Sequence, residues 1–149
     1  DNFKAYNDVY GFSSGDKAII LTADIIMDNV RHFGAQDDFI GHVGGDDFII
    51  VTVPERVDAI CTGIISDFDK RIVSLYSEKD RQKGYITTVS REGLFLEFPI
   101  MTISIAVVSN THRTFNGPDE VGEAAAKLKK KAKSVLGSVY IKDDEECNI

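Results

Sequence analysis

The chain has 149 residues, of which 43% are hydrophobic and 28% are charged, and its formal net charge is −7. These values are typical of one folded domain and exclude a disordered chain. The acidic balance argues against non-specific nucleic-acid binding, and no run of 18 apolar residues predicts a membrane span. Cys61 and Cys147 show neither disulfide nor metal spacing, so we expect a cytoplasmic domain that makes no membrane contact.

The first third of the chain predicts a loop followed by a helix. Residues 1–16 are rich in Asp, Asn, Gly and Ser, which is typical of a loop-rich segment with at most a short helical stretch. Apolar residues then recur at three- and four-residue steps and predict an amphipathic helix over Lys17–Phe33. Asp16 is a suitable N-cap for this helix, and Gly34 a suitable stop.

Two short apolar runs, Phe39–Val43 and Phe48–Val53, flank a glycine–aspartate turn and predict a β-hairpin. The further expected elements are a helix over Glu55–Tyr76, a charged connection over Ser77–Gly84, strands over Tyr85–Ser90 and Leu94–Phe98, a buried central strand over Met101–Ser109, a helix from Asp119, as its cap, to about Val135, and a strand over Val139–Ile141. Helices that alternate with hairpins predict an α+β domain over residues 1–149, with an antiparallel-rich central sheet and helices packed on it.

The hairpin turn, Gly44-Gly45-Asp46-Asp47-Phe48, carries the strongest chemical signal. Its two glycines allow a tight turn and let a ligand approach the main chain at Gly45. Adjacent carboxylates on a strand point to opposite sides, so Asp46 and Asp47 can serve different partners. Mg²⁺ is commonly held by one or two carboxylates together with phosphate oxygens. On these five residues alone, an ordinary hairpin turn remains an equal alternative.

The residues before the first helix make the pattern specific. They follow the order D-x-F-K-x-x-N-D-x-x-G-x-x-x-G-D and are Asp1, Phe3, Lys4, Asn7, Asp8, Gly11, Gly15 and Asp16. Together with the hairpin, this order resembles the GGDEF family. Thr102 to Ala106 resembles the family's T-x-S-I-G strand, and Ala132-Lys133 its last-helix A-K. The resemblance implies a nucleotide-cyclase or palm-like fold with a ferredoxin-like core.

The resemblance also implies an activity. GGDEF domains convert two GTP molecules into cyclic di-GMP and two pyrophosphates, with each domain of a dimer holding one GTP. The expected cofactor is Mg²⁺ or Mn²⁺, and the expected partners are GTP, a second GGDEF domain and an upstream sensor or receiver domain. The family's leading metal-binding Asp and first strand would precede Asp1, so we expect a fragment that is inactive by itself.

Residue roles follow from the same resemblance. Asn7 and Asp16 would read guanine, since an amide and a carboxylate suit the purine edge. Asp46 would bind the metal, and Asp47 would assist it and the deprotonation of the 3′-hydroxyl group.

Lys4, Lys133 and the backbone near Phe3 would contact the triphosphate, next to Gly45. Simpler roles stay open: Asp16 as a helix cap, Asn7 in a turn, Phe3 in the core and Lys133 on a solvated basic face.

Several departures from the family pattern lower the expected activity. Asp47 replaces the usual Glu with a shorter side chain, and the Gly-Arg-Asn-Arg segment after the last helix is absent. The family's R-x-x-D inhibitory site aligns with Ala35 and Asp38, so we expect weak binding of cyclic di-GMP. Residues 84–99 form a longer connection than usual. The alternatives are therefore an impaired GGDEF domain that binds GTP and regulates a neighbour, or a purely structural dimerisation element.

Overall fold

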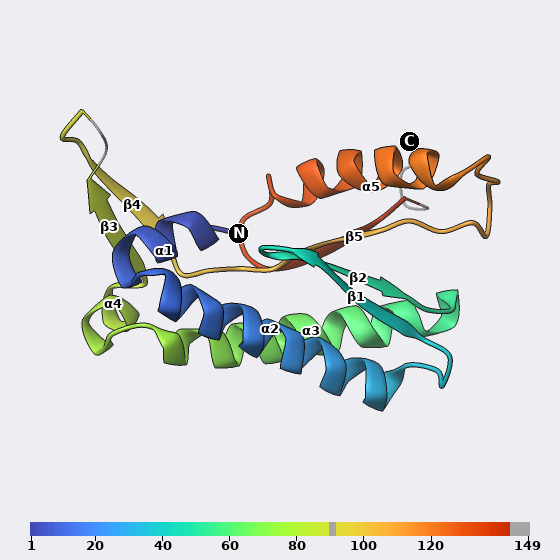
Figure 1. Ribbon diagram of the computed structural model, residues 1–149, viewed down its shortest axis with the longest axis horizontal. Helices are drawn as coiled ribbons and strands as arrows, with labels where there is room; N and C mark the ends of the chain where they lie inside the picture. The colour runs from blue at the N-terminus through green and yellow to red at the C-terminus, as the bar shows by residue number, and fades with distance from the viewer. Residues whose placement is uncertain (90–91, 144–149) are drawn as a thin grey trace.

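A computed structural model describes residues 1–89 and 92–143 (Figure 1). The helices are α1 (Phe3–Tyr10), α2 (Phe12–Phe33), α3 (Val57–Ile72), α4 (Glu78–Lys83) and α5 (Pro118–Ala132), with 3-10 turns at Pro54–Arg56 and Val73–Leu75. The strands are β1 (Phe39–Gly44), β2 (Asp47–Val51), β3 (Tyr85–Val89), β4 (Phe95–Pro99), β5 (Ser104–Val107) and β6 (Val139–Lys142). This mixture of helices and small sheets agrees with the predicted α+β class.

The strands form separate pairs. β1 pairs with β2 and β3 with β4, both antiparallel, while β5 pairs with β6 in parallel. The prediction of one central sheet is therefore wrong for residues 1–89 and 92–143, where each sheet has two strands. Of the strand predicted over Met101–Ser109, only the four residues of β5 are observed as a strand. Within the described residues β5 pairs with β6 and with no other strand.

The core lies where α2 packs against α3, along the lower edge of the molecule in Figure 1. Ile25 of α2 and Ile60 and Ile64 of α3 are fully buried. The helices approach closely at Gly63, where an added Cβ would lie 2.1 Å from Oδ1 of Asn29. The fully buried apolar side chains supply most of the stabilisation, since each contributes about 1.5–3 kcal/mol.

The N-terminal segment differs most from the expectation. Residues 3–10 form α1, and α2 begins at Phe12 with Gly11 (φ 81°) as its N-cap, so Asp16 lies inside the helix and does not cap it. The stabilising contacts are aromatic, because Tyr6 stacks on Tyr10 with centroids 4.8 Å apart and packs edge-on against Tyr76 at 5.0 Å. Tyr76 lies 66 positions after Tyr10, so local composition did not reveal its contacts with α1.

Smaller corrections concern three expected boundaries. The connection over Ser77–Gly84 contains α4, which Ser77 caps because its Oγ accepts a hydrogen bond from the Asp80 backbone N–H at 3.2 Å. The last helix begins at Pro118 with Gly117 as its N-cap, so Asp119 lies in the first turn. Ser90 and the residues after Asp143 lie outside the described part of the chain.

Candidate functional site

The glycine–aspartate turn lies at the tip of the β1–β2 hairpin. Gly44 pairs with Asp47 across the strands, which leaves Gly45 and Asp46 as the two central residues of the turn. Gly45 has a φ of 56°, and a two-residue hairpin that needs positive φ at its first central position favours glycine there. The turn therefore presents Asp46 at its tip.

His42 holds this turn from within the hairpin. Its Nε2 lies 3.0 Å from the Gly45 carbonyl oxygen and donates to it, while its ring stacks on Phe48 with centroids 4.6 Å apart. Phe48 in turn packs against the hydrophobic core. The position of His42 two residues before Gly44 indicates a structural role beside the turn, and these contacts agree with it.

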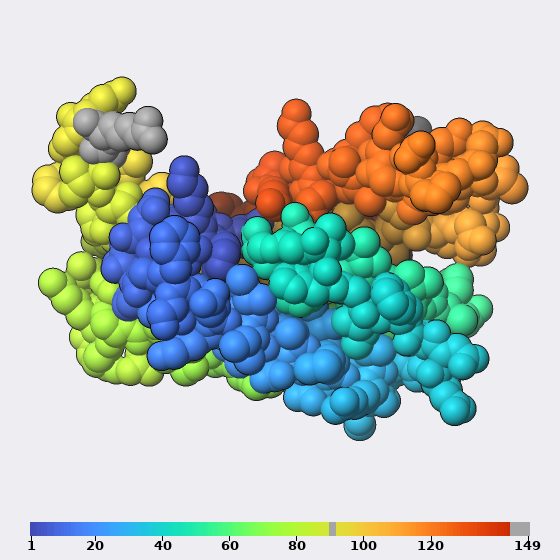
Figure 2. Space-filling view, viewed as in Figure 1, coloured from blue at the N-terminus to red at the C-terminus, as the bar shows by residue number. Residues whose placement is uncertain are grey.

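Beside the turn lies a cleft of about 700 Å³. Figure 2 shows the surface hollowed between the β3–β4 hairpin in yellow and α5 in orange, above the N-terminal segment in blue. The cleft is lined by Asp1, Asn2, Phe3, Lys4, Ala5, Asp8, Asp46, Thr88, Val89, Leu96, Phe98 and Lys133. It thus unites four predicted site residues from three separate segments, namely Phe3, Lys4, Asp46 and Lys133.

The N-terminus of α1 faces this cleft through Asn2, Phe3 and Lys4. The first N–H groups of a helix have no acceptor within the helix, and the Asn2 side chain does not cap them. Asn2 has a φ of 61°, the only positive φ at a non-glycine residue in the described chain. Exposed helix N–H groups form a favourable site for an anion such as phosphate.

Asp1 links the N-terminus of α1 to β5 and to the segment just before it. Its Oδ2 accepts hydrogen bonds from Ser104 Oγ at 2.5 Å and Thr102 Oγ1 at 3.2 Å, and its amino group donates to the Thr102 carbonyl oxygen at 2.7 Å. Asp1 therefore holds the start of α1 beside β5.

Asn7 and Asp16, the expected guanine-reading residues, do not line the cleft. Asn7 projects from α1 toward α2, where Gly15 leaves room for it: an added Cβ on Gly15 would lie 1.9 Å from Asn7 Oδ1. That oxygen is buried and has no hydrogen-bond partner within the described residues. A buried polar atom without a partner is costly and is well explained by a ligand. Asp16 is exposed one residue further along α2.

The two acidic residues of the turn have different surroundings. Asp46 faces the cleft, whereas the Asp47 side chain is 63% exposed and its Oδ1 lies 3.6 Å from Lys129 Nζ of α5. Asp46 thus lines the cleft, whereas Asp47 pairs with α5. Gly45 and Asp47 are thus adjacent to the cleft but are not part of its lining.

The described residues contain no group of three or more His, Cys, Asp or Glu side chains placed to hold a metal ion. Asp46 nevertheless presents one carboxylate to the cleft, beside the N-terminus of α1. The Asp1 carboxylate already accepts hydrogen bonds from Ser104 and Thr102. One carboxylate suits Mg²⁺ that is already bound to phosphate oxygens and water. The donor set therefore fits an ion that arrives with a nucleotide.

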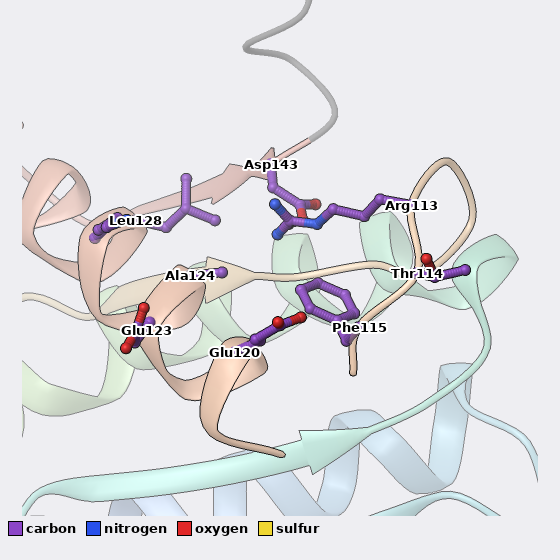
Figure 3. Close-up of a pocket in the computed structure, with 9 residues that line it drawn as sticks. Arg113, Thr114, Phe115, Glu120, Glu123, Ala124, Leu128 and Asp143 are labelled. Atoms are coloured by element: carbon purple, nitrogen blue, oxygen red, sulfur yellow. Dashed lines mark hydrogen bonds and ion pairs between the residues drawn. The ribbon is translucent and has the colours of Figure 1, made fainter. Parts of the chain in front are cut away.

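A second, smaller cavity of about 360 Å³ lies near the N-terminal end of α5. Figure 3 shows Arg113 reaching Asp143, with its guanidinium above Phe115. The ion pair measures 2.5 Å, and the guanidinium carbon lies 4.4 Å from the ring centroid. Only 8% of the Asp143 side chain is exposed. None of the predicted site residues lines this cavity.

Comparison with known proteins agrees with this geometry. The family model described as diguanylate cyclase, GGDEF domain, matches residues 1–89, more than half of the chain. The chain belongs to the GGDEF family.

Among curated relatives, the bifunctional diguanylate cyclase/cyclic di-GMP phosphodiesterase MucR of Pseudomonas aeruginosa is 40% identical over 76 residues, or 51% of this chain and 10% of the relative. The diguanylate cyclase DosC of Escherichia coli is 39% identical over 51 residues, or 34% of this chain and 10% of the relative. The matches thus span about a tenth of these relatives. None of the described helices has the length and apolar character needed to cross a membrane.

Proposed function

We propose that this domain is the catalytic domain of a diguanylate cyclase, which condenses two GTP molecules into cyclic di-GMP and two pyrophosphates. The observation that carries the proposal is the cleft, which places Asp46 beside the N-terminus of α1 and Lys133. A carboxylate, free helix N–H groups and a lysine together suit a metal–triphosphate group. The family membership and the cyclase names of the relatives support the same reaction class.

Substrate binding would involve two regions. The N–H groups at Phe3 and Lys4, with the Lys4 and Lys133 side chains, would bind the triphosphate near Gly45. Asn7 and Asp16 would bind guanine, with the buried Asn7 Oδ1 accepting the hydrogen bond that it lacks here. The Asn7 carbonyl oxygen and the Asp16 carboxylate both accept hydrogen bonds, so each would face an N–H donor on the guanine edge.

The reaction forms a bond from the 3′-hydroxyl oxygen of each GTP to the α-phosphorus of the other, and each α-phosphorus loses pyrophosphate. Two domains would therefore hold their nucleotides antiparallel in a homodimer. Mg²⁺ or Mn²⁺, when bound, supplies charge neutralisation on the phosphate oxygens. Asp46 would bind the metal ion, and Asp47 would take up the 3′-hydroxyl proton. Positioning of the two nucleotides would supply most of the rate acceleration.

The test is to incubate the full-length protein with GTP and MgCl₂ and to separate the nucleotides by chromatography. We expect cyclic di-GMP from the wild-type protein, and a loss of at least about a hundredfold in Asp46→Asn, since its carboxylate faces the cleft. Asp37→Asn is the matched control, because Asp37 is exposed and lies outside the cleft. Wild-type turnover in Asp46→Asn would refute the assigned role.

A second candidate function is a GTP-binding regulatory domain without turnover. It is favoured by one observation, the ion pair of Asp47 with Lys129, which engages the carboxylate that would otherwise accept the 3′-hydroxyl proton. The shorter side chain of Asp, compared with the usual Glu, adds to this effect. GTP binding without any cyclic di-GMP from the full-length protein would support this function, and an upstream sensor or receiver domain would then be the partner that it regulates.

A further inference from the structure

The C-terminal half of α5 carries a run of lysines, of which two share one face. Lys129 and Lys133 are four residues apart, and residues at this spacing lie one above the other on a helix. Lys133 lines the cleft, and Lys129 Nζ lies 3.6 Å from Asp47 Oδ1. Figure 1 shows the tip of the β1–β2 hairpin below this end of α5. The two lysines therefore border the same side of the site.

Asp47 does not hold Lys129 firmly. The side chains of Lys129 and Asp47 are 35% and 63% exposed, and an ion pair of this kind contributes little to stability. A lysine ammonium group on its flexible four-carbon chain can exchange one anionic partner for another. A triphosphate is more highly charged than a single carboxylate, so it competes well for a lysine within reach.

This side of the cleft also needs positive charge. Among the described residues, three carboxylates line the cleft, at Asp1, Asp8 and Asp46, against two lysines, Lys4 and Lys133. The C-terminal end of a helix has a partial negative charge, which disfavours phosphate unless side chains compensate for it. The five residues after Lys133 read Ser-Val-Leu-Gly-Ser and supply no cation.

We propose that Lys129 is a second triphosphate-binding residue, which acts with Lys133 and releases Asp47 when GTP binds. The inference rests on the proposed function, because it takes the cleft to be the GTP site. It adds a residue that the sequence motifs do not mark. It also gives Asp47 two states, paired with Lys129 in the free domain and free for the 3′-hydroxyl group in the complex.

The test is calorimetric titration of the full-length protein with GTP and MgCl₂, alongside GMP, which lacks the β- and γ-phosphates. We expect Lys129→Met and Lys133→Met each to weaken GTP binding about tenfold, the effect of one lost charge-assisted hydrogen bond. Binding of GMP should change less than twofold. Lys127→Met is the matched control, because Lys127 is exposed and lines the smaller cavity instead of the cleft, so it should leave GTP binding unchanged.

The outcomes separate the inference from the function on which it rests. GTP binding by Lys129→Met that equals binding by Lys127→Met, with a wild-type protein that binds GTP, would overturn the inference alone. Equal weakening of GTP and GMP binding would also overturn it, because Lys129 would then act only by holding the turn. A wild-type protein that does not bind GTP would overturn both. Retained GTP binding in Lys129→Arg would support a direct contact with phosphate.

Discussion

Gly15→Ala tests whether the position of Asn7 matters for guanine binding. The added Cβ would lie 1.9 Å from Asn7 Oδ1, and ordinary contacts begin at about 3.4 Å, so the amide must move by about 1.5 Å. A displacement near 1 Å in a binding site can cost on the order of a hundredfold in rate. Alanine is also the better helix former by about 1 kcal/mol, which offsets part of the steric cost to folding.

We therefore expect Gly15→Ala to lower kcat/KM for GTP about a hundredfold in the full-length protein, while the free energy of unfolding changes by less than about 1 kcal/mol. Both quantities are measured, by product chromatography and by urea denaturation. Gly122→Ala is the control, since its added Cβ meets nothing within 4 Å in α5. It should stabilise the helix without affecting GTP. Wild-type kinetics for Gly15→Ala would refute the role given to Asn7.

Three further predictions concern stability and reactivity. Gly63→Ala places a Cβ 2.1 Å from Asn29 Oδ1 and should cost about 1–3 kcal/mol in urea denaturation; no loss would contradict the close packing of α2 and α3. Tyr10→Phe removes the hydroxyl's bonds to Ser77 N–H and the Asp80 carboxylate, and should cost about 1–2 kcal/mol by the same assay. Burial raises the pKa of Cys61 to about 11 from 9.0. In the Cys147→Ser variant, Cys61 is the one remaining cysteine of this sequence. The reaction of the Cys61 thiol with a disulfide reagent at pH 8 should be at least about a hundredfold slower than that of a free thiol. Because the folded pKa is the higher one, this thiol's contribution to stability is full below pH 9 and is lost as pH rises through about 11.

The hairpins could be predicted because their signals are local. Period-two alternation and the glycine–aspartate turn placed β1 and β2 within two residues of their observed ends. Helix α1 could not be predicted in this way, because its stability depends on contacts of Tyr6 and Tyr10 with Tyr76, far along the chain. Phe3, Tyr6 and Tyr10 recur at helical spacing, but the Asp, Asn, Gly and Ser residues around them are typical of a loop.

In the candidate site, too, the local features could be predicted and the contacts between elements could not. Motif matching selected Phe3, Lys4, Asp46 and Lys133, which the structure brings to one cleft. It did not reveal that Lys129 pairs with Asp47 or that His42 holds the turn, since both depend on which side chains meet between elements. The roles of the predicted residues remain predictions, whereas their places in the fold are now known.

The β3–β4 hairpin gives the cleft a wall that has no part in the motif. Leu96 and Phe98 of β4 line the cleft, although the family match ends at residue 89. The cleft therefore combines the charged groups of Lys4, Asp46 and Lys133 with an apolar surface from β4. Substitutions in β4 can reshape the space around a bound nucleotide while every motif residue is kept. Two GGDEF chains with identical motifs can thus differ in how closely they enclose the same substrate.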